Sequence, residues 1–117
     1  MAPGDGIKPQ VLLIASVRSG QMTHPVDIPS IRSTWHSRGF SCDVWNDPSG
    51  QVWENYTHAV DELVMVLEGE VEFEISGKIL QPVVGEEVFI PAGAVHSVRN
   101  KGITTSRWLY GYRCSDR

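Results

Sequence analysis

Long apolar segments are absent from this chain of 117 residues, and their absence excludes a membrane-spanning helix. Such a helix needs about 20 consecutive apolar residues, and the apolar run at residues 11–17 is far shorter. The run is also a poor signal peptide, because Asp5 precedes it and no clean small-residue cleavage site follows it. We therefore expect residues 11–17 to form a strand, and we expect a cytoplasmic protein with no membrane partner.

Basic residues are scarce as well. Lys and Arg together number 10 against 14 Asp and Glu, which gives a formal net charge of −4. A protein that binds nucleic acid through its phosphates usually carries excess and clustered positive charge. The charge balance therefore predicts that nucleic acid is not a partner.

Only two cysteines are present, Cys42 and Cys114. They are too far apart in the sequence to form a CxxC redox motif or a zinc-type pair. In a reducing cytoplasm we expect both to be free thiols that are buried like small apolar residues. A disulfide between them is the alternative that we consider less favourable.

Glycine and proline, by contrast, are frequent, with 11 and 7 residues respectively. Such a composition favours many turns and short strands around one core, which a chain of this length can form. One short helix is expected at residues 29–38, with Pro29 in its first turn and Gly39 just past its end. About eight to ten strands are indicated by apolar runs and alternation, and we expect an all-β sandwich or barrel. The main candidates are residues 11–17, 40–46, 62–68, 71–75, 78–80, 88–90, 95–98 and 104–112.

The candidate strand at residues 62–68 is apolar on both faces. Alternation places Val64 and Val66 on the same side as Glu62, whereas Leu63, Met65 and Leu67 point the opposite way. If the first side lines a barrel, the second must be covered by another sheet, by the N-terminal strand or by a partner. We predict a homodimer; a monomer closed by its own N-terminal strand satisfies the same pattern.

Two of the four histidines stand near a glutamate in a pattern that suits a metal site. His58 and Glu62 are four residues apart, which places them on one face of a helix or, as the neighbouring sequence favours, of a strand. His96 follows on a later strand. Two imidazoles and one carboxylate are suitable ligands for Fe, Mn, Ni, Cu or Zn and leave coordination positions open. A His-x3-Glu pair alone is a weak signal, and a single strand histidine is more often structural.

The glycines and the proline around these residues make the signal specific, because the chain resembles the cupins. The first cupin motif reads G-x5-H-x-H-x3,4-E-x6-G, and here it is Gly50-x5-Tyr56-x-His58-x3-Glu62-x6-Gly69. The second reads G-x5-P-x-G-x2-H-x3-N, and here it is Gly85-x5-Pro91-x-Gly93-x2-His96-x3-Asn100. The resemblance covers about residues 40–112.

The resemblance implies a double-stranded β-helix, or jelly-roll, barrel at residues 40–117, preceded at 1–39 by an arm, a strand and the short helix. It also implies one divalent transition metal (Fe, Mn, Ni or Zn) held inside the barrel by His58, Glu62 and His96. The expected ligand of the protein is a small organic molecule. We expect Trp53 and Tyr56 to line the pocket, and Trp45, Trp108, Tyr110 and Tyr112 to belong to the core. Asn100 is expected to bind backbone, and Glu70, Glu72 and Glu74 to form a solvated face.

Tyr56 is the departure from the family pattern, because it stands where the family has a histidine. It could bind the metal as a phenolate, which is costly at a pKa near 10. It could instead be a hydroxyl that faces substrate beside a metal with three protein ligands, which is the interpretation that we favour. It could also mark a barrel that has lost tight metal binding.

The resemblance supports two main hypotheses about function. The first is a metal-dependent enzyme, either dioxygenase-like or a Lewis acid for isomerisation or hydrolysis. The second is a non-catalytic small-molecule binding or sensor protein, because the fold does not fix the function. A metal-free isomerase of nucleotide sugars is a third and weaker hypothesis, since the chain is short for such a site.

Overall fold

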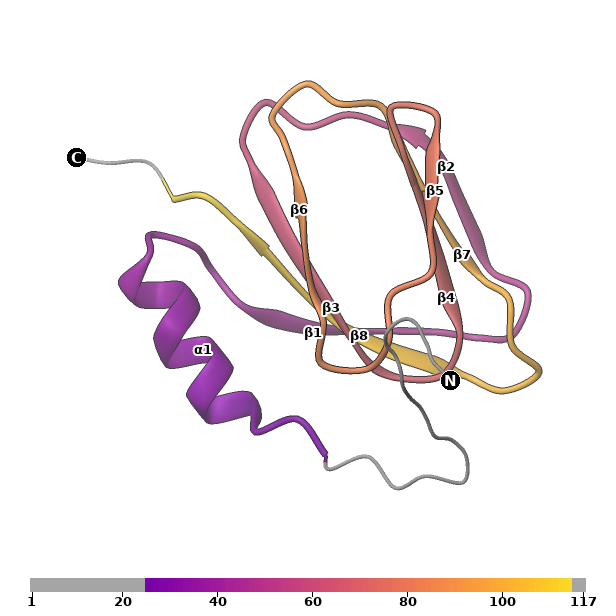
Figure 1. Ribbon diagram of the computed structural model, residues 1–117, viewed down its shortest axis with the longest axis horizontal. Helices are drawn as coiled ribbons and strands as arrows, with labels where there is room; N and C mark the ends of the chain where they lie inside the picture. The colour runs from indigo at the N-terminus through magenta and orange to yellow at the C-terminus, as the bar shows by residue number, and fades with distance from the viewer. Residues whose placement is uncertain (1–24, 115–117) are drawn as a thin grey trace, which may run out of the picture.

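Two four-stranded antiparallel sheets face each other and form a jelly-roll barrel in the computed structural model, which describes residues 25–114 (Figure 1). One sheet has the order β1-β8-β3-β6 and the other β2-β7-β4-β5. The fold is therefore all-β with one short helix, as the sequence predicts. The elements are α1 Ile28–Ser37, β1 Asp43–Asp47, β2 Val52–Tyr56, β3 Glu62–Glu68, β4 Val71–Ile75, β5 Lys78–Leu80, β6 Glu87–Ile90, β7 His96–Asn100 and β8 Ser106–Tyr112.

The interior of the barrel is filled by the inward side chains of both sheets. On β3 these are Val64 and Val66, and on β4 they are Val71 and Phe73, as alternation predicts. All four side chains are buried, and Trp108 of β8 packs edge-on against Phe73. This apolar core fixes the two sheets against each other and supports the open end of the barrel, where the polar residues lie.

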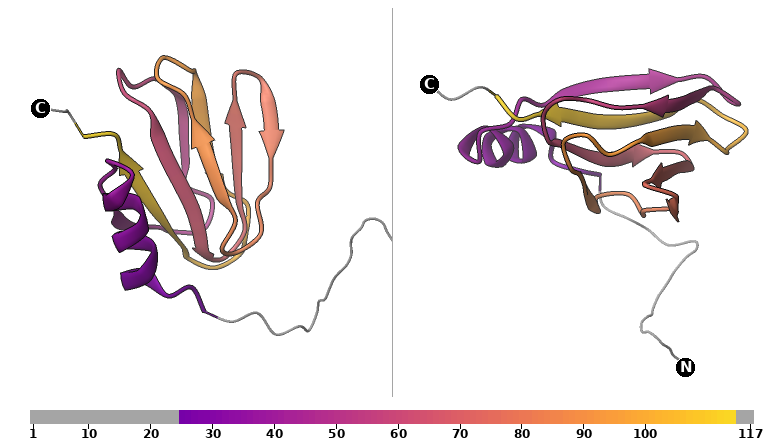
Figure 2. Two further views of the ribbon diagram at one scale, coloured as in Figure 1. Left: turned by 60° about the vertical axis from the view of Figure 1, so that its left-hand side comes forward. Right: turned by 90° about the horizontal axis from the view of Figure 1, so that it is seen from above.

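Helix α1 lies outside the barrel and covers the outer face of the sheet that contains β1, β8 and β3 (Figures 1 and 2). Its first turn is capped by Asp27, whose carboxylate accepts a hydrogen bond from the backbone N–H of Ser30. Gly39 follows the helix with a φ of 88°, which glycine adopts at little cost. The helix thus begins and ends within a residue of the predicted bounds.

The second face of β3 packs against this helix. Leu63 and Met65 form a buried cluster with Trp35 of α1 and with Leu109 of β8. The indole N–H of Trp35 donates to Oε1 of Glu87, which also pairs with Arg38 at 2.8 Å. The cover expected from a second sheet, an N-terminal strand or a partner is therefore supplied by α1. Dimerisation stays a prediction. The apolar second face of β3, which suggested it, needs no partner subunit because α1 covers this face.

Strand β2 was not among the strands predicted from the sequence. Its residues Val52–Tyr56 include Glu54 and Asn55, and most of its side chains are exposed, so its apolar pattern is weak. The register of β2 against β7 shifts between Trp53 and Tyr56, which marks a bulge. Asn55 lies in this bulge with a φ of 59°, and its backbone N–H donates to the hydroxyl of Ser97. The predicted strand at residues 11–17 lies outside the described residues.

The cysteines are free, as expected, but only Cys42 is buried. Cys114 is exposed, which corrects the prediction that both thiols are buried. Among residues 25–114, no helix has the length and apolar character needed to cross a membrane.

Candidate metal centre

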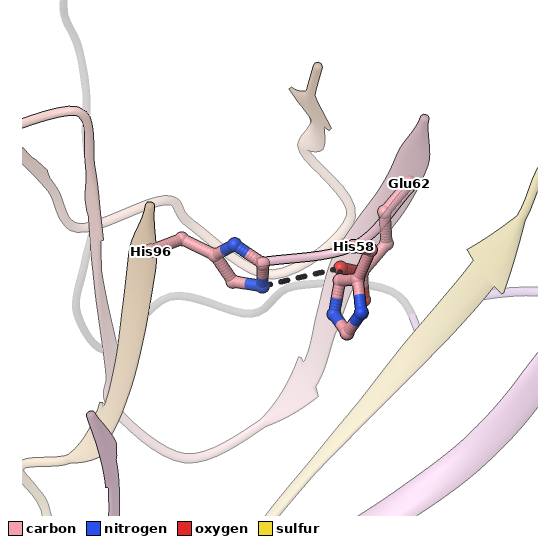
Figure 3. Close-up of side chains that lie close together, drawn as sticks. All are labelled: His58, Glu62 and His96. Carbon is pink, nitrogen blue, oxygen red and sulfur yellow. Dashed lines mark ion pairs between the residues drawn. The ribbon is translucent and has the colours of Figure 1, made fainter. Parts of the chain in front are cut away.

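The three predicted ligands come from different elements, and their side chains lie close together (Figure 3). Glu62 is the first residue of β3 and His96 is the first residue of β7. His58 lies in the loop between β2 and β3, which corrects its predicted place on a strand. A backbone hydrogen bond of 2.8 Å from Gly93 N–H to the carbonyl of His58 ties this loop to the turn that precedes His96. Residues far apart in the sequence are thereby fixed beside each other.

The donor atoms of the three side chains lie within 4.8 Å of one another. Oε1 of Glu62 is 3.4 Å from Nε2 of His58 and 3.5 Å from Nε2 of His96. Ligand bonds of about 2.0–2.2 Å place neighbouring donors of one ion roughly 2.8–3.6 Å apart. The two distances from Glu62 to the imidazole nitrogens, 3.4 and 3.5 Å, lie in this range.

The carboxylate of Glu62 is buried, and its Oε1 atom has no hydrogen-bond partner among the described residues. Burial raises the pKa of Glu62 to about 7, because removing the group from water disfavours its charged form. An unpaired buried oxygen is costly, and a cation at this point would relieve that cost. Glu62 is therefore the strongest indication that the site takes a metal.

The imidazole of His96 is held in one tautomer. Its Nδ1 atom lies 3.0 Å from the carbonyl oxygen of Ala94, and a carbonyl can only accept a hydrogen bond. Nδ1 therefore carries the hydrogen, and Nε2 presents its lone pair toward Glu62. A backbone acceptor of this kind is the usual partner of a metal-binding histidine.

The imidazole of His58 is kept neutral by its surroundings. Desolvation, and secondarily the proximity of His96, lower the pKa of His58. Two imidazoles and one carboxylate form a donor set that fits a divalent transition metal. The residues present therefore fit the group that the resemblance implies.

Tyr112 is a polar neighbour of the site that the sequence did not indicate. Its hydroxyl lies 3.4 Å from Nε2 of His58, and the two rings meet edge-on with centroids 4.9 Å apart. Burial, with Glu62 as the next cause, raises the pKa of Tyr112 to about 12, so its hydroxyl keeps its proton at neutral pH. Tyr112 was expected in the core because it ends an apolar strand, and no spacing signal linked it to His58.

Tyr56 lies across the site on β2, opposite His96 in the register of β2 against β7. Its side chain is 44% exposed and lines the cavity together with Trp53. These residues are three apart, and regular alternation would place them on opposite faces of the strand. The bulge at Asn55 brings both to the same face, which confirms the prediction that both line the pocket.

A cavity of about 280 Å³ extends from the three candidate metal-binding residues along an aromatic wall. Trp45, Trp108, Tyr110 and Tyr112, which were expected in the core, all line this cavity. The core prediction is confirmed for Trp108, which is buried in the apolar core as well, and Tyr110 packs against that core. Alternation on β8 shows that Trp108, Tyr110 and Tyr112 share one face, but it does not show whether that face meets a core or a cavity. The remaining lining residue is Val98.

Two other groups lie away from the cavity. The side-chain amide of Asn100 binds the backbone carbonyls of Asp47, Pro48 and Thr104, which confirms its expected structural role. Glu72 and Glu74 are not simply a solvated face, because both pair with Arg99, at 2.7 and 2.8 Å.

Comparison with known proteins agrees with this geometry. A family model described as "Cupin domain" matches residues 44–112. The solved structure of the protein TT1209 from Thermus thermophilus is 26% identical at a TM-score of 0.58, with 65% of this chain and 74% of that chain covered. No curated protein matches the sequence.

Two more distant structures show the same fold. A protein of Thermotoga maritima described as a predicted oxalate decarboxylase is 23% identical at a TM-score of 0.60, with 68% of this chain and 71% of that chain covered. A salicylate 1,2-dioxygenase from Pseudaminobacter salicylatoxidans is 17% identical at a TM-score of 0.60, with coverages of 64% and 22%.

Proposed function

The chain belongs to the cupin family, and on that premise we propose that it is a metal-dependent protein that acts on a small organic molecule. In this proposal His58, Glu62 and His96 hold one divalent transition metal, with Fe, Mn, Ni and Zn as the candidates. The observation that carries the proposal is the buried, unpaired Oε1 of Glu62 between two imidazole nitrogens. The fold alone would not support it, because one fold serves many functions.

A metal held in this way supplies a Lewis acid with open coordination positions, which suits oxygen-dependent or polarising chemistry. The carbonyl of Ala94 fixes the orientation of the His96 ring, so that Nε2 faces Glu62. Tyr112 keeps a protonated hydroxyl beside His58, where it can donate a hydrogen bond to a bound oxygen group. The aromatic wall of the cavity supplies an apolar surface beside that group. Dioxygenase-like chemistry is our first choice among the reactions of such a site.

Elemental analysis of protein purified without chelator tests the metal. We expect about one first-row metal ion per chain in the wild type, and a loss of it in His58→Ala and in His96→Ala. His36→Ala is the matched control, because His36 is an exposed histidine of helix α1. A protein that holds no stoichiometric metal and takes up none on reconstitution with Fe, Mn, Ni or Zn would overturn the proposal.

A non-catalytic binding or sensor protein is the second candidate. Tyr56 favours it, because this residue stands where the family has a histidine. A thermal-shift screen of small acids, sugars and phenols, with and without metal, finds ligands in either case. Oxygen uptake or product formation with any of these ligands would decide for the enzyme.

We also propose that the protein is cytoplasmic and forms a homodimer. Within residues 25–114, strand β6 pairs only with β3, and Phe89 on it is 48% exposed. An edge strand with an apolar side chain is suited to pairing with a second copy. Light scattering of the purified protein should give about twice the chain mass, and Phe89→Glu should lower it; a monomeric wild type would refute the dimer.

A further inference from the structure

One buried carboxylate accepts hydrogen bonds from the indole N–H groups of three tryptophans. Oδ1 of Asp47 accepts hydrogen bonds from Trp45 at 2.8 Å and from Trp53 at 3.0 Å. Oδ2 of Asp47 accepts a third from Trp108 at 3.1 Å. Asp47 itself is only 2% exposed. The three indoles, which come from β1, β2 and β8, are thus oriented by a single side chain.

This arrangement determines which chemical groups Trp45, Trp53 and Trp108, the tryptophan wall of the cavity, present to a ligand. The N–H is the only polar group of an indole, and in all three it is already bound to Asp47. The tryptophans therefore present only carbon atoms and π faces to the cavity. Trp45 meets Trp53 and Tyr110 in edge-to-face contacts, with centroids 6.1 and 6.2 Å apart, so the wall is fixed by its own packing.

Among residues 25–114, no lysine or arginine lines the cavity. Arg99, on the strand that contributes His96 and Val98, pairs with Glu54, Glu72 and Glu74 instead. This part of the chain thus provides no cation to hold a small dianion, and an anionic oxygen is best placed at the metal end. A positively charged ligand is disfavoured for the complementary reason, because a divalent metal at that end would repel it.

We propose that this cavity selects a small ligand with one aromatic ring and one oxygen donor group. This inference rests on the proposed metal-dependent function. The ring lies against Trp45, Trp53 and Trp108, the oxygen donor faces the metal end, and Asp47 is the positioning residue of the wall. The cavity of about 280 Å³ is at the small end of ligand sites, which typically measure about 300–1,000 Å³, and this suits a single ring.

Benzoate and acetate are matched probes, because both carry one carboxylate and only benzoate has a ring. Calorimetry with the zinc-loaded protein should give an affinity for benzoate at least about tenfold above that for acetate. Cyclohexanecarboxylate should bind more weakly than benzoate, because its puckered ring cannot lie flat against the indoles. Equal affinities of benzoate and acetate, or tighter binding of cyclohexanecarboxylate, would overturn the inference.

Variants locate the effect on the wall. Trp45 is 40% exposed, so Trp45→Ala should fold normally while reducing benzoate affinity about tenfold and leaving acetate and zinc binding unchanged. Trp35→Phe is the control, because Trp35 belongs to helix α1 and packs on the outer face of the sheet, outside the cavity. Asp47→Asn should lower the ratio of benzoate to acetate affinity at unchanged zinc binding. A loss of both ligands and of zinc in both wall variants would show a merely structural role and contradict the assignment.

Separate measurements test ring recognition by the tryptophans and metal binding by the proposed site. If zinc does not bind, quenching of tryptophan fluorescence by phenol in the metal-free protein still tests the wall, with Trp45→Ala as the comparison. Phenol binding without any metal binding would refute the proposed function and support the wall. Zinc binding without any preference for benzoate would refute the wall and leave the proposed function standing.

Discussion

The hydroxyl of Tyr112 lies as close to Nε2 of His58 as Oε1 of Glu62 does, at 3.4 Å in both cases. Nε2 of His58 therefore has the Tyr112 hydroxyl on one side and the unpaired Oε1 of Glu62 on the other. Because a metal must take the lone pair of this nitrogen, it competes with the Tyr112 hydroxyl. In our proposal Tyr112 therefore lowers the metal affinity of His58 and is not a fourth ligand.

Tyr112→Phe should raise metal affinity about two- to tenfold, which is the range of one net hydrogen bond. Competition with a chromogenic chelator measures the change. Tyr110→Phe is the matched control, since Tyr110 also lines the cavity but makes no hydrogen bond to His58. A tenfold or greater fall in affinity for Tyr112→Phe would show that the phenol oxygen binds the metal directly.

Tyr56→His should increase metal affinity by at least about tenfold. Tyr56 is paired with His96 across β2 and β7, and directly opposed residues of antiparallel strands point to the same face. An imidazole at this position would restore the four-ligand pattern of the family. Metal titration of the variant checks the prediction, with Tyr56→Phe as the control that should match the wild type within about threefold. An unchanged affinity in Tyr56→His would show that this position does not reach the metal.

Metal affinity should depend on pH through Glu62. A carboxylate binds the metal only when deprotonated, and the pKa of Glu62 is raised to about 7. Affinity should therefore rise with pH up to about 7, by close to tenfold per unit, and level off above it. Titrations in non-coordinating buffers between pH 5.5 and 8.5 would measure this profile. A profile that levels off near pH 5 would mean that Glu62 is not a ligand.

Without metal, the same shift should make the fold less stable as pH rises. The folded state holds the Glu62 proton up to about pH 7, whereas the unfolded chain releases it near 4.5. Folding therefore takes up a proton in this window, and the contribution of Glu62 is lost between about pH 4.5 and 7. The loss is on the order of 3 kcal/mol. Urea unfolding of the apo protein should show a flatter pH dependence in Glu62→Gln; identical slopes would contradict the assignment.

Gly111→Ala should destabilise the protein by roughly 2–4 kcal/mol. A methyl group on Gly111 of β8 would collide with the backbone of Ser41 and lie 3.0 Å from the Trp35 ring. The glycine thus allows α1 and its following segment to approach the sheet closely. Thermal unfolding measures the loss. Gly102→Ala is the control, because an added methyl there meets nothing closer than 3.5 Å; equal effects would refute this account.

The convergence of the three candidate metal-binding residues was predictable because they follow a fixed spacing. The two sequence motifs were sufficient to identify His58, Glu62 and His96. Strands β3, β4 and β5 have the predicted bounds because turn glycines separate them. Strand β2 was missed because a bulge and polar residues break its alternation. The aromatic cavity was missed because side chains such as Trp108 and Tyr110 look the same in sequence whether they face a core or a pocket. Their shared acceptor, Asp47, is visible only in three dimensions.

The contact between helix α1 and strand β3 has a consequence for how this protein can be divided. Leu63 and Met65 complete a core whose other half, Trp35, precedes the family match at residues 44–112. A fragment that begins at the start of the barrel would expose those side chains to solvent, and the fragment would then tend to self-associate. The smallest piece that keeps its solubility therefore includes the helix, and any transplantation of this barrel onto another chain must carry residues 27–40 with it.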